Sequence, residues 1–336
     1  MATIIYPETF AGSTKPGVWE PDVLGVGFSQ QTLFLASDEE GPVVATVVKY
    51  VDAHTDPAKT PVLYVHGWSD YFFNRQFARF WARRGHPFYA LDLRKYGRSL
   101  RDWQSPGQVE ELIQYDEELV QACRLIRQDS GGQRRQRLLL AGHSTGGLVL
   151  SLWANRHPER VAGLVLNSPW LEFQGSALMR QFASAMIDPW NILTPRRELH
   201  LPKPEYYFRS MADSEQGQWQ LHPVWRPPGG FPIYPSWVKA ILNGHAEIAK
   251  GLSIEAPVWT VLAAESQIWS AWQARMQQVD IVLDVQEVAA RISGLGSEVT
   301  LYRQTGAMHD VFASFQPARG QAYEALSRWA DGYVVA

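Results

Sequence analysis

The stretch that most restricts the fold of this chain runs from Arg137 to Gly147. An apolar run, 138–141, has the character of a buried strand, and it ends abruptly in Gly-His-Ser-Thr-Gly at 142–146. Apolar residues then return at helical spacing from Leu148 onward. A sharp turn carrying Ser144 between a strand and a helix matches the G-x-S-x-G nucleophile elbow, in which glycines leave room for close backbone. The helix that follows directs its first N–H groups toward a site where negative charge develops.

Strands and helices alternate over most of the chain, which predicts a doubly wound, parallel α/β sheet with its site at the carboxyl ends of the strands. Two β-rich runs, 32–36 and 43–50, flank a turn cluster and are predicted to pair antiparallel. Further strands are predicted at 61–68 (ending in a glycine turn), 87–93, 161–167, 257–264 and 298–302. Helices are predicted at 75–84, 109–128, 285–292 and 320–329.

The alternation stops after Pro169 and returns only near residue 256. The intervening residues are rich in Trp, Pro and Tyr, and they are too many for a simple connection, so a functional insertion is favoured. We therefore expect a core formed by 1–169 and 256–336, with 170–255 as an inserted cap that is helical at 178–187 and 237–248. The alternative is an ordinary subdomain with no role in the site.

Composition narrows the class of protein. With 336 residues and a formal net charge of −3, the chain has no excess of basic residues that would suggest a nucleic acid or an anionic membrane as partner. The single cysteine, Cys123, excludes an internal disulfide and is expected in the core. No signal peptide or membrane-spanning run is recognised, so a cytoplasmic location is expected. The 14 tryptophans suggest aromatic pocket surfaces, although a buried core position is the commoner explanation for each one.

A serine nucleophile needs a base within hydrogen-bond reach and a carboxylate to orient that base. His309 is the histidine that follows the last predicted strand, where the base is expected. The acid should follow the strand at 257–264, and the candidates are Glu265, Asp280 and Asp284. Glu265 is closest to the strand, and Asp284 is well explained as the N-cap of the next helix. Asp280 therefore fits the orienting role best, with the other two left open.

The oxyanion of an acyl-transfer intermediate needs two preorganised N–H donors. One is expected from the backbone of Thr145, after the nucleophile, and the other from Trp68, after the first predicted parallel strand. Residues beside these groups are expected to contact the substrate: His66, Gly67, His143 and Trp170. The remaining histidines show no metal-ligand spacing, and the chain has neither G-x-G-x-x-G nor a P-loop, so no metal or cofactor is expected.

With these residues identified, the chain resembles the α/β-hydrolase superfamily, and most of all its monoacylglycerol lipase and lysophospholipase-like branch, grouped with serine aminopeptidase-type hydrolases. The matching segments are 64–71, 92–99, 142–147, 166–170, 280–284 and 306–310. The resemblance implies a mostly parallel eight-stranded sheet, with a cap between the sixth and seventh strands. It also implies Ser144 as nucleophile, His309 as base and Asp280 as acid.

The expected function is a cofactor-independent serine hydrolase that cleaves carboxylic esters, either acylglycerol-like or lysophospholipid-like esters or small apolar ones. Because the predicted cap is rich in Pro and Trp and lacks a long apolar helix, lipase activity is less strongly indicated than hydrolysis itself. An aminopeptidase or amidase would need an acid in the cap to hold the substrate amine. The acids available there are Glu205, Asp213, Glu215 and Glu247. A non-catalytic binding protein on the same scaffold is the third alternative, since fold does not fix function.

Overall fold

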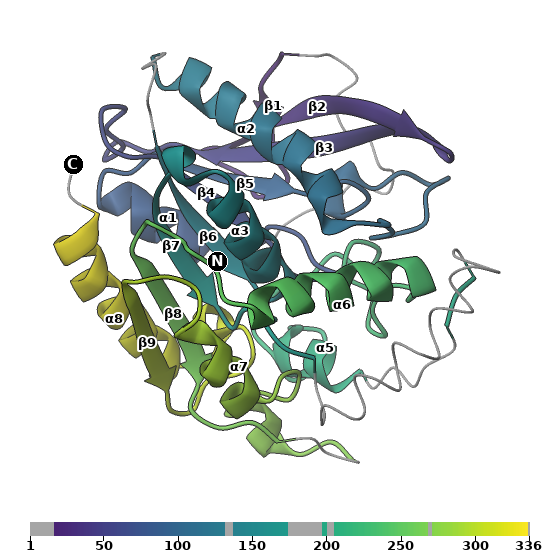
Figure 1. Cartoon of the computed structure of the whole chain (residues 1–336), viewed down its shortest axis with the longest axis vertical. Helices are drawn as coiled ribbons and strands as arrows, with labels where there is room; N and C mark the ends of the chain where they lie inside the picture. The colour runs from purple at the N-terminus through teal and green to yellow at the C-terminus, as the bar shows by residue number, and fades with distance from the viewer. Residues whose placement is uncertain (1–16, 132–136, 174–196, 200–204, 268–270, 335–336) are drawn as a thin grey trace.

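The structure, a computed structural model, describes residues 17–131, 137–173, 197–199, 205–267 and 271–334 (Figure 1). Over these residues the chain forms one nine-stranded sheet in the order β1-β2-β3-β5-β4-β6-β7-β8-β9. The strands are β1 (Glu20–Pro21), β2 (Phe28–Asp38), β3 (Gly41–Tyr50), β4 (Val62–Val65), β5 (Phe88–Asp92), β6 (Leu138–His143), β7 (Val161–Asn167), β8 (Val258–Ala263) and β9 (Val299–Gln304). The helices are α1 (Arg75–Arg83), α2 (Asp116–Asp129), α3 (Thr145–Arg156), α5 (Tyr206–Met211), α6 (Pro235–Ala249), α7 (Val285–Ile292) and α8 (Ala318–Tyr333).

The predicted sheet type is confirmed. Strands β5, β4, β6, β7, β8 and β9 pair parallel with their neighbours, and the β1–β2–β3–β5 edge is antiparallel. The described sheet has one strand more than the eight expected, because the short strand β1 pairs with β2. The expected antiparallel pair at the start of the chain is β2 and β3.

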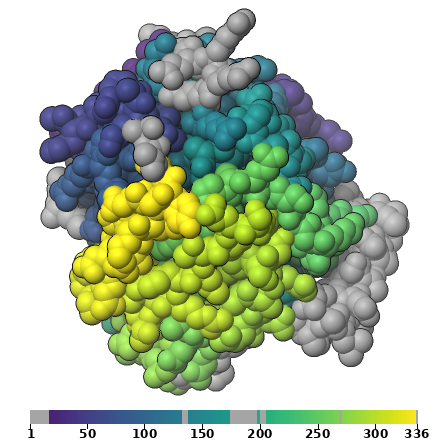
Figure 2. All heavy atoms as spheres, turned by 60° about the vertical axis from the view of Figure 1, so that its left-hand side comes forward, coloured from purple at the N-terminus to yellow at the C-terminus, as the bar shows by residue number. Residues whose placement is uncertain are grey.

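Helices cover both faces of the sheet, as the alternation predicts. Side chains on successive strand residues point to opposite faces. On β6, a Cβ added at Gly142 would meet Gly146 and Gly147 of α3. The side chain of Leu139, three residues earlier on the same strand, points to the opposite face. There it lies near Trp329 of α8, because a Cβ added at Gly163 would meet both side chains. Helices α3 and α8 therefore lie on opposite faces. In Figure 2, the C-terminal part of the chain, coloured yellow-green to yellow, lies against the blue and teal N-terminal half.

The strand order places the site. The chain forms β4, then adds β5 on one side of it and β6 on the other, so the direction of winding reverses between β4 and β6. Open α/β sheets bind ligands at such a reversal, outside the carboxyl ends of the strands. The loop after β4 contains Gly67 and Trp68, and the turn after β6 contains Ser144. Both predicted oxyanion donors therefore come from this one point of the sheet.

Three helix predictions need correction or comment. The helix expected at 109–128 is a 3₁₀ turn, Leu112–Tyr115, followed by α2, which starts at Asp116. Its later start follows from a capping box between Glu111 and Gln114, which begins the 3₁₀ turn at that point. The helix expected at 237–248 is α6, which has Pro235 at its first turn. The helix expected at 178–187 lies outside the described residues.

Arg98 connects three parts of the chain beneath the site. Its guanidinium donates to Asp22 at 2.6 and 3.0 Å, to Asp92 at the end of β5 at 2.8 Å, and to the carbonyl of Phe72 at 3.1 Å. Burial lowers the pKa of Arg98, but the two carboxylates more than offset this, and the pKa lies above its ordinary value. The charge of Arg98 is therefore kept, and it holds the loop after β4 against β5.

Replacing Arg98 with Ala should lower the free energy of unfolding by about 3–5 kcal/mol, because two buried carboxylates lose their cation. Urea unfolding of Arg98→Ala measures this loss. Arg275→Ala is the matched control, since it removes an ion pair with Glu265 in which both side chains are more than half exposed. The control should change stability by less than about 1 kcal/mol. Similar losses in the two variants would contradict the role given to Arg98.

Candidate active site

The turn at Ser144 is strained, and glycines make it possible. Ser144 has φ 50° and ψ −117°, a conformation that costs free energy in a residue with a side chain. A Cβ added to Gly146 would lie 2.3 Å from the carbonyl oxygen of His66, and one added to Gly142 would lie 2.8 Å from that of Gly146. Helix α3 therefore begins in backbone contact with the end of β4. This contact brings Ser144 beside the loop that contains Trp68.

The structure brings His309 and Asp280 together. The Nδ1 of His309 lies 2.8 Å from Oδ2 of Asp280, and the two side chains are 1% and 0% exposed. Asp280 Oδ1 accepts N–H groups from Val282 and Leu283 at 2.7 and 2.8 Å, which fix the carboxylate. His309 Nε2 is buried and has no hydrogen-bond partner among the described residues. An imidazole held at Nδ1 in this way keeps Nε2 for proton transfer.

The chain returns to the end of β8 before it reaches Asp280. The N–H of Asp280 donates to the carbonyl of Glu265 at 2.9 Å, and the N–H of Gln267 donates to the carbonyl of Asp280 at 2.9 Å. The chain after β8 therefore folds back on itself. As a result, Asp280 lies next to the end of β8, as if it followed the strand directly. The other two candidates have different roles: Asp284 caps α7 through Gln286 and Glu287, and the exposed side chain of Glu265 pairs with Arg275.

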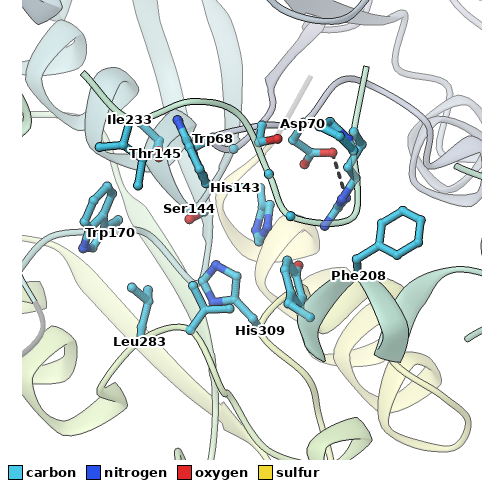
Figure 3. A pocket seen from close by; sticks show the side chains of 18 of the residues that line it. Trp68, Asp70, His143, Ser144, Thr145, Trp170, Phe208, Ile233, Leu283 and His309 are labelled. Carbon is cyan, nitrogen blue, oxygen red and sulfur yellow. Dashed lines mark hydrogen bonds and ion pairs between the residues drawn. The ribbon is translucent and has the colours of Figure 1, made fainter. Parts of the chain in front are cut away.

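A cavity of about 430 Å³ opens above Ser144 (Figure 3). Its lining includes Ser144, His309, His143, Gly67 and both predicted oxyanion residues. The apolar side chains that line it are Trp68, Trp170, Phe173, Phe208, Ile233, Trp237, Val282 and Leu283. A cavity of this size with a largely apolar wall is typical of a small-molecule site.

One side of the cavity is polar. Arg226 donates to Oδ1 of Asp70 at 2.8 Å, and both residues are buried. The guanidinium of Arg226 also lies over the ring of Tyr207, 5.1 Å from its centroid, and Tyr207 packs edge-on against His309 at 5.5 Å. Burial lowers the pKa of Arg226, but Asp70 and Tyr207 outweigh this, and the pKa lies above its ordinary value. The pair is therefore charged, and its net charge is zero.

The residues expected to contact the substrate fall into two groups. Gly67, His143 and Trp170 line the cavity. His66 is not among its lining residues, because the ring is turned toward the protein interior, where Nε2 accepts the N–H of Leu93 at 3.1 Å. His143 packs beside His309, with ring centroids 4.9 Å apart. Burial lowers the pKa of His143, so the ring is neutral near pH 7 and adds no cation beside His309.

Sequence reasoning missed the polar residues that surround this pair. Tyr207 lies on the short helix α5 and Arg226 in a loop, both in the segment after β7, where no periodic pattern in the sequence marks either position as buried. Asn167 and Asp310 had a weak signal: each is a polar residue next to a predicted strand end or to the expected base. Asn167 Nδ2 donates to Oδ1 of Asp310 at 2.7 Å, in the buried region under His309.

One other predicted feature, the position of Cys123, can be placed on the described residues. Cys123 is buried, and burial raises its pKa to about 11, so the thiol is neutral near pH 7. Among the residues that the structure describes, no group of three His, Cys, Asp or Glu side chains could hold a metal ion. No helix in the same residues is both long and apolar enough to cross a membrane.

The sheet, the strained elbow at its winding reversal and the cavity above it define an α/β hydrolase. Comparison with protein families agrees. The model described as "Serine aminopeptidase, S33" matches residues 56–313, and the chain therefore belongs to this family of α/β hydrolases.

Solved structures share the fold at low sequence identity. A monoacylglycerol lipase from Paleococcus ferrophilus is 18% identical, with a TM-score of 0.57 over 82% of this chain and 96% of that one. A monoglyceride lipase from Saccharomyces cerevisiae is 16% identical, with a TM-score of 0.61 over 90% and 96%. A carboxyl esterase from Bacillus coagulans is 13% identical, with a TM-score of 0.62 over 91% and 99%.

Among curated proteins, the chain is similar to 1-acylglycerol-3-phosphate O-acyltransferase ABHD5 from Rattus norvegicus. The two are 28% identical over 125 residues, which is 35% of this chain and 32% of the relative. The match to the Mus musculus protein of the same name has the same extent. The alignment thus spans about a third of these relatives.

Adding a methyl group at Gly146 should disturb the elbow, because the added Cβ would overlap two carbonyl oxygens of β4 and its loop. We expect Gly146→Ala to lower the free energy of unfolding by about 1–3 kcal/mol, measured by urea unfolding. Gly332→Ala is the control: it lies on α8 with nothing within 4 Å of the added Cβ. It should be neutral or raise stability by about 0.5–1 kcal/mol, since Ala favours a helix over Gly. A Gly146→Ala protein as stable as wild type would contradict the close approach.

Proposed function

We propose that this protein is a cofactor-independent serine hydrolase that cleaves carboxylic esters through an acyl-enzyme. The observation that carries the proposal is the buried His309–Asp280 pair, whose histidine lines the same cavity as Ser144. Membership of the hydrolase family and the structural likeness to lipases and esterases support hydrolysis in general. The catalytic role assigned to each residue is part of what we propose.

In the proposed reaction, Ser144 Oγ attacks the ester carbonyl carbon while His309 Nε2 takes the hydroxyl proton. Asp280 stabilises the imidazolium that results. The carbonyl oxygen becomes an oxyanion and accepts the N–H groups of Trp68 and Thr145. The bond from carbon to the leaving oxygen then breaks, and His309 protonates the departing alcohol. Water repeats the sequence on the acyl-enzyme and releases the acid and free Ser144.

We also propose that residues 170–255 act as a cap over this site. The described parts of this segment supply Tyr207, Phe208, Ile233 and Trp237 to the cavity wall, together with the Arg226–Gly230 turn. Trp170 and Phe173, at the start of the segment, also line the cavity, and the remainder of the wall comes from the core. A cap of this kind sets the size and polarity of the group that fits beside Ser144, because it forms the side of the cavity opposite the sheet.

One side of the cavity is apolar and the other is polar, which favours an ester whose acyl group is apolar and whose alcohol is polar. Trp68, Trp170 and Trp237 surround an apolar space that suits an acyl chain or another apolar group. The leaving alcohol must lie within reach of His309 Nε2. His309 packs against Tyr207, and the guanidinium of Arg226, which pairs with Asp70, lies over the Tyr207 ring. A hydroxylated alcohol, as in acylglycerol-like or lysophospholipid-like esters, would find hydrogen-bonding groups there. Small apolar esters fit the apolar side alone.

An aminopeptidase is the second candidate, because the matching family model bears that description. Such an enzyme needs an unpaired carboxylate to hold the substrate amine. Among the described residues that line the cavity, the carboxylate is Asp70, and Arg226 neutralises it. The four acids considered from the sequence, Glu205, Asp213, Glu215 and Glu247, are not in that lining. The charge pattern therefore favours esters.

The nucleophile is tested with p-nitrophenyl esters from acetate to palmitate and with a fluorophosphonate probe. We expect wild type to hydrolyse part of the series and to form a covalent adduct at Ser144, located by peptide mass spectrometry. Ser144→Ala should lose the adduct and at least about 10⁴-fold in kcat, because the nucleophile is absent. A folded wild type that neither reacts with the probe nor cleaves any ester, but cleaves amino-acid p-nitroanilides, would favour the aminopeptidase. Inertness to all substrates would favour a binding protein.

The three candidate acids are separated by three single variants. Asp280→Asn should lower kcat about 10³- to 10⁴-fold, because an amide no longer stabilises the imidazolium or fixes its tautomer. Asp284→Ala should keep kcat near wild type and lower the free energy of unfolding by about 1 kcal/mol, because α7 loses its cap. Glu265→Gln should leave both nearly unchanged, since its ion pair is exposed. A larger kcat loss in either of the last two than in Asp280→Asn would overturn the assignment.

A further inference from the structure

Asn167 is the last residue of β7, and it lies directly beside the nucleophile elbow. In the parallel pair β6–β7 its register partner is His143, the residue before Ser144. The carbonyl oxygen of Asn167 accepts the N–H of Ser144 at 3.0 Å and lies 3.1 Å from Nδ1 of His143. The backbone of Asn167 therefore holds the base of the elbow.

The side chain of the same residue holds the histidine loop. Asn167 Nδ2 donates to Oδ1 of Asp310 at 2.7 Å, and Asn167 Oδ1 accepts the N–H of Val311 at 3.1 Å. Asp310 and Val311 directly follow His309 in the chain. Both hydrogen-bonding atoms of the amide are thus used, and Asn167 and Asp310 are only 4% and 2% exposed. Water cannot compete for these bonds, because both partners are buried.

The histidine loop has other outside partners, since Asn74 Nδ2 and Trp219 Nε1 donate to the carbonyls of Phe312 and Ala313 at 3.3 and 2.7 Å. Further hydrogen bonds fix the loop's own shape. Ser314 Oγ accepts the N–H of Met308 at 2.8 Å and donates to the carbonyl of Asp310 at 3.2 Å. Asp310 Oδ1 also accepts the N–H of Ala313 at 3.1 Å, which caps a short 3₁₀ turn. These contacts begin and end within the loop. The Asn167 side chain, in contrast, connects the loop to the strand that also holds the elbow.

We infer that Asn167 is a positioning residue that sets the place of His309 relative to Ser144. The inference rests on the proposed function, in which His309 Nε2 takes the Ser144 proton. Because proton transfer requires the two atoms to approach within hydrogen-bond reach, a small displacement of the histidine loop slows acylation even when the substrate binds normally. Asn167 acts through the loop and touches no reacting atom.

The test compares Asn167→Leu with wild type. Leucine has the same number of side-chain heavy atoms, branched at the same carbon, and makes neither bond. The loop therefore loses its link to β7 while the space stays filled. We expect kcat on a p-nitrophenyl ester and the rate constant of fluorophosphonate labelling to fall together about 10- to 100-fold, with KM within about twofold. The end-point labelling stoichiometry should stay near one adduct per folded chain, which separates a slow site from an unfolded one.

Two variants of the partner residue sharpen this test. Asp310→Asn keeps an oxygen that can accept from Asn167 Nδ2 and from the Ala313 N–H, so its labelling rate should be within about threefold of wild type. Asp310→Ala removes the acceptor and should resemble Asn167→Leu. The double variant Asn167→Leu with Asp310→Ala should be little slower than either single variant, since the two act through one contact.

Asn155→Leu is the matched control, because Asn155 Oδ1 also accepts a distant backbone N–H, that of Ser253 at 2.7 Å, but at an exposed position away from the cavity. Its labelling rate should equal that of wild type. If Asn167→Leu labels at the wild-type rate, or loses stoichiometry with no change in rate per active site, the positioning role is wrong and Asn167 only stabilises the fold. If wild type itself does not react with the probe, the serine-hydrolase proposal fails instead.

Discussion

The site depends on one close contact between two backbones. The first turn of α3 lies against the carbonyl oxygens at the end of β4, and only a glycine at 146 leaves space for this approach. The contact has two consequences. It forces Ser144 into a left-handed conformation that lifts its side chain away from the sheet, and it places the start of α3 next to the loop that contains Trp68. The strain is tolerated because the parallel strands on both sides of β6 are buried and hydrogen-bonded.

A second constraint is that carboxylates close together in the sequence have separate structural environments. Asp280 and Asp284 are four positions apart, yet one is fully buried against His309 and the other caps α7 at the surface. The difference comes from the return of the chain beside Glu265, which brings the backbone of Asp280 into the end of the sheet. Two backbone N–H groups then offset part of the cost of burying the charge. The pairing with His309 follows from this placement.

Local pattern was sufficient to predict most of the strands, the elbow and the N-cap of α7. Strands such as β4 and β6 are continuous apolar runs, and α7 begins at Asp284 as its N-cap residue indicates. From the sequence, the three candidate acids could only be ranked. Which of them reaches His309 depends on how the irregular segment after β8 folds back to the end of that strand. Arg226 and Tyr207 could not be found, because their burial results from contacts with core residues distant in the sequence. The later start of α2 shows that a capping interaction can override apolar periodicity.

The Asp70–Arg226 pair helps to hold the described residues 205–249, a segment between β7 and β8, beside the cavity. Arg226 comes from that segment and Asp70 from the loop after β4, and both side chains are less than a tenth exposed. Removing water from two charges is costly, and their attraction offsets this only with good geometry, so the pair adds little net stability. An arrangement that separates the two charges, however, leaves each buried without its partner, at a cost of several kcal/mol. The pair therefore disfavours other placements of the segment, and the cavity wall that includes Tyr207 and Trp237 depends on that placement.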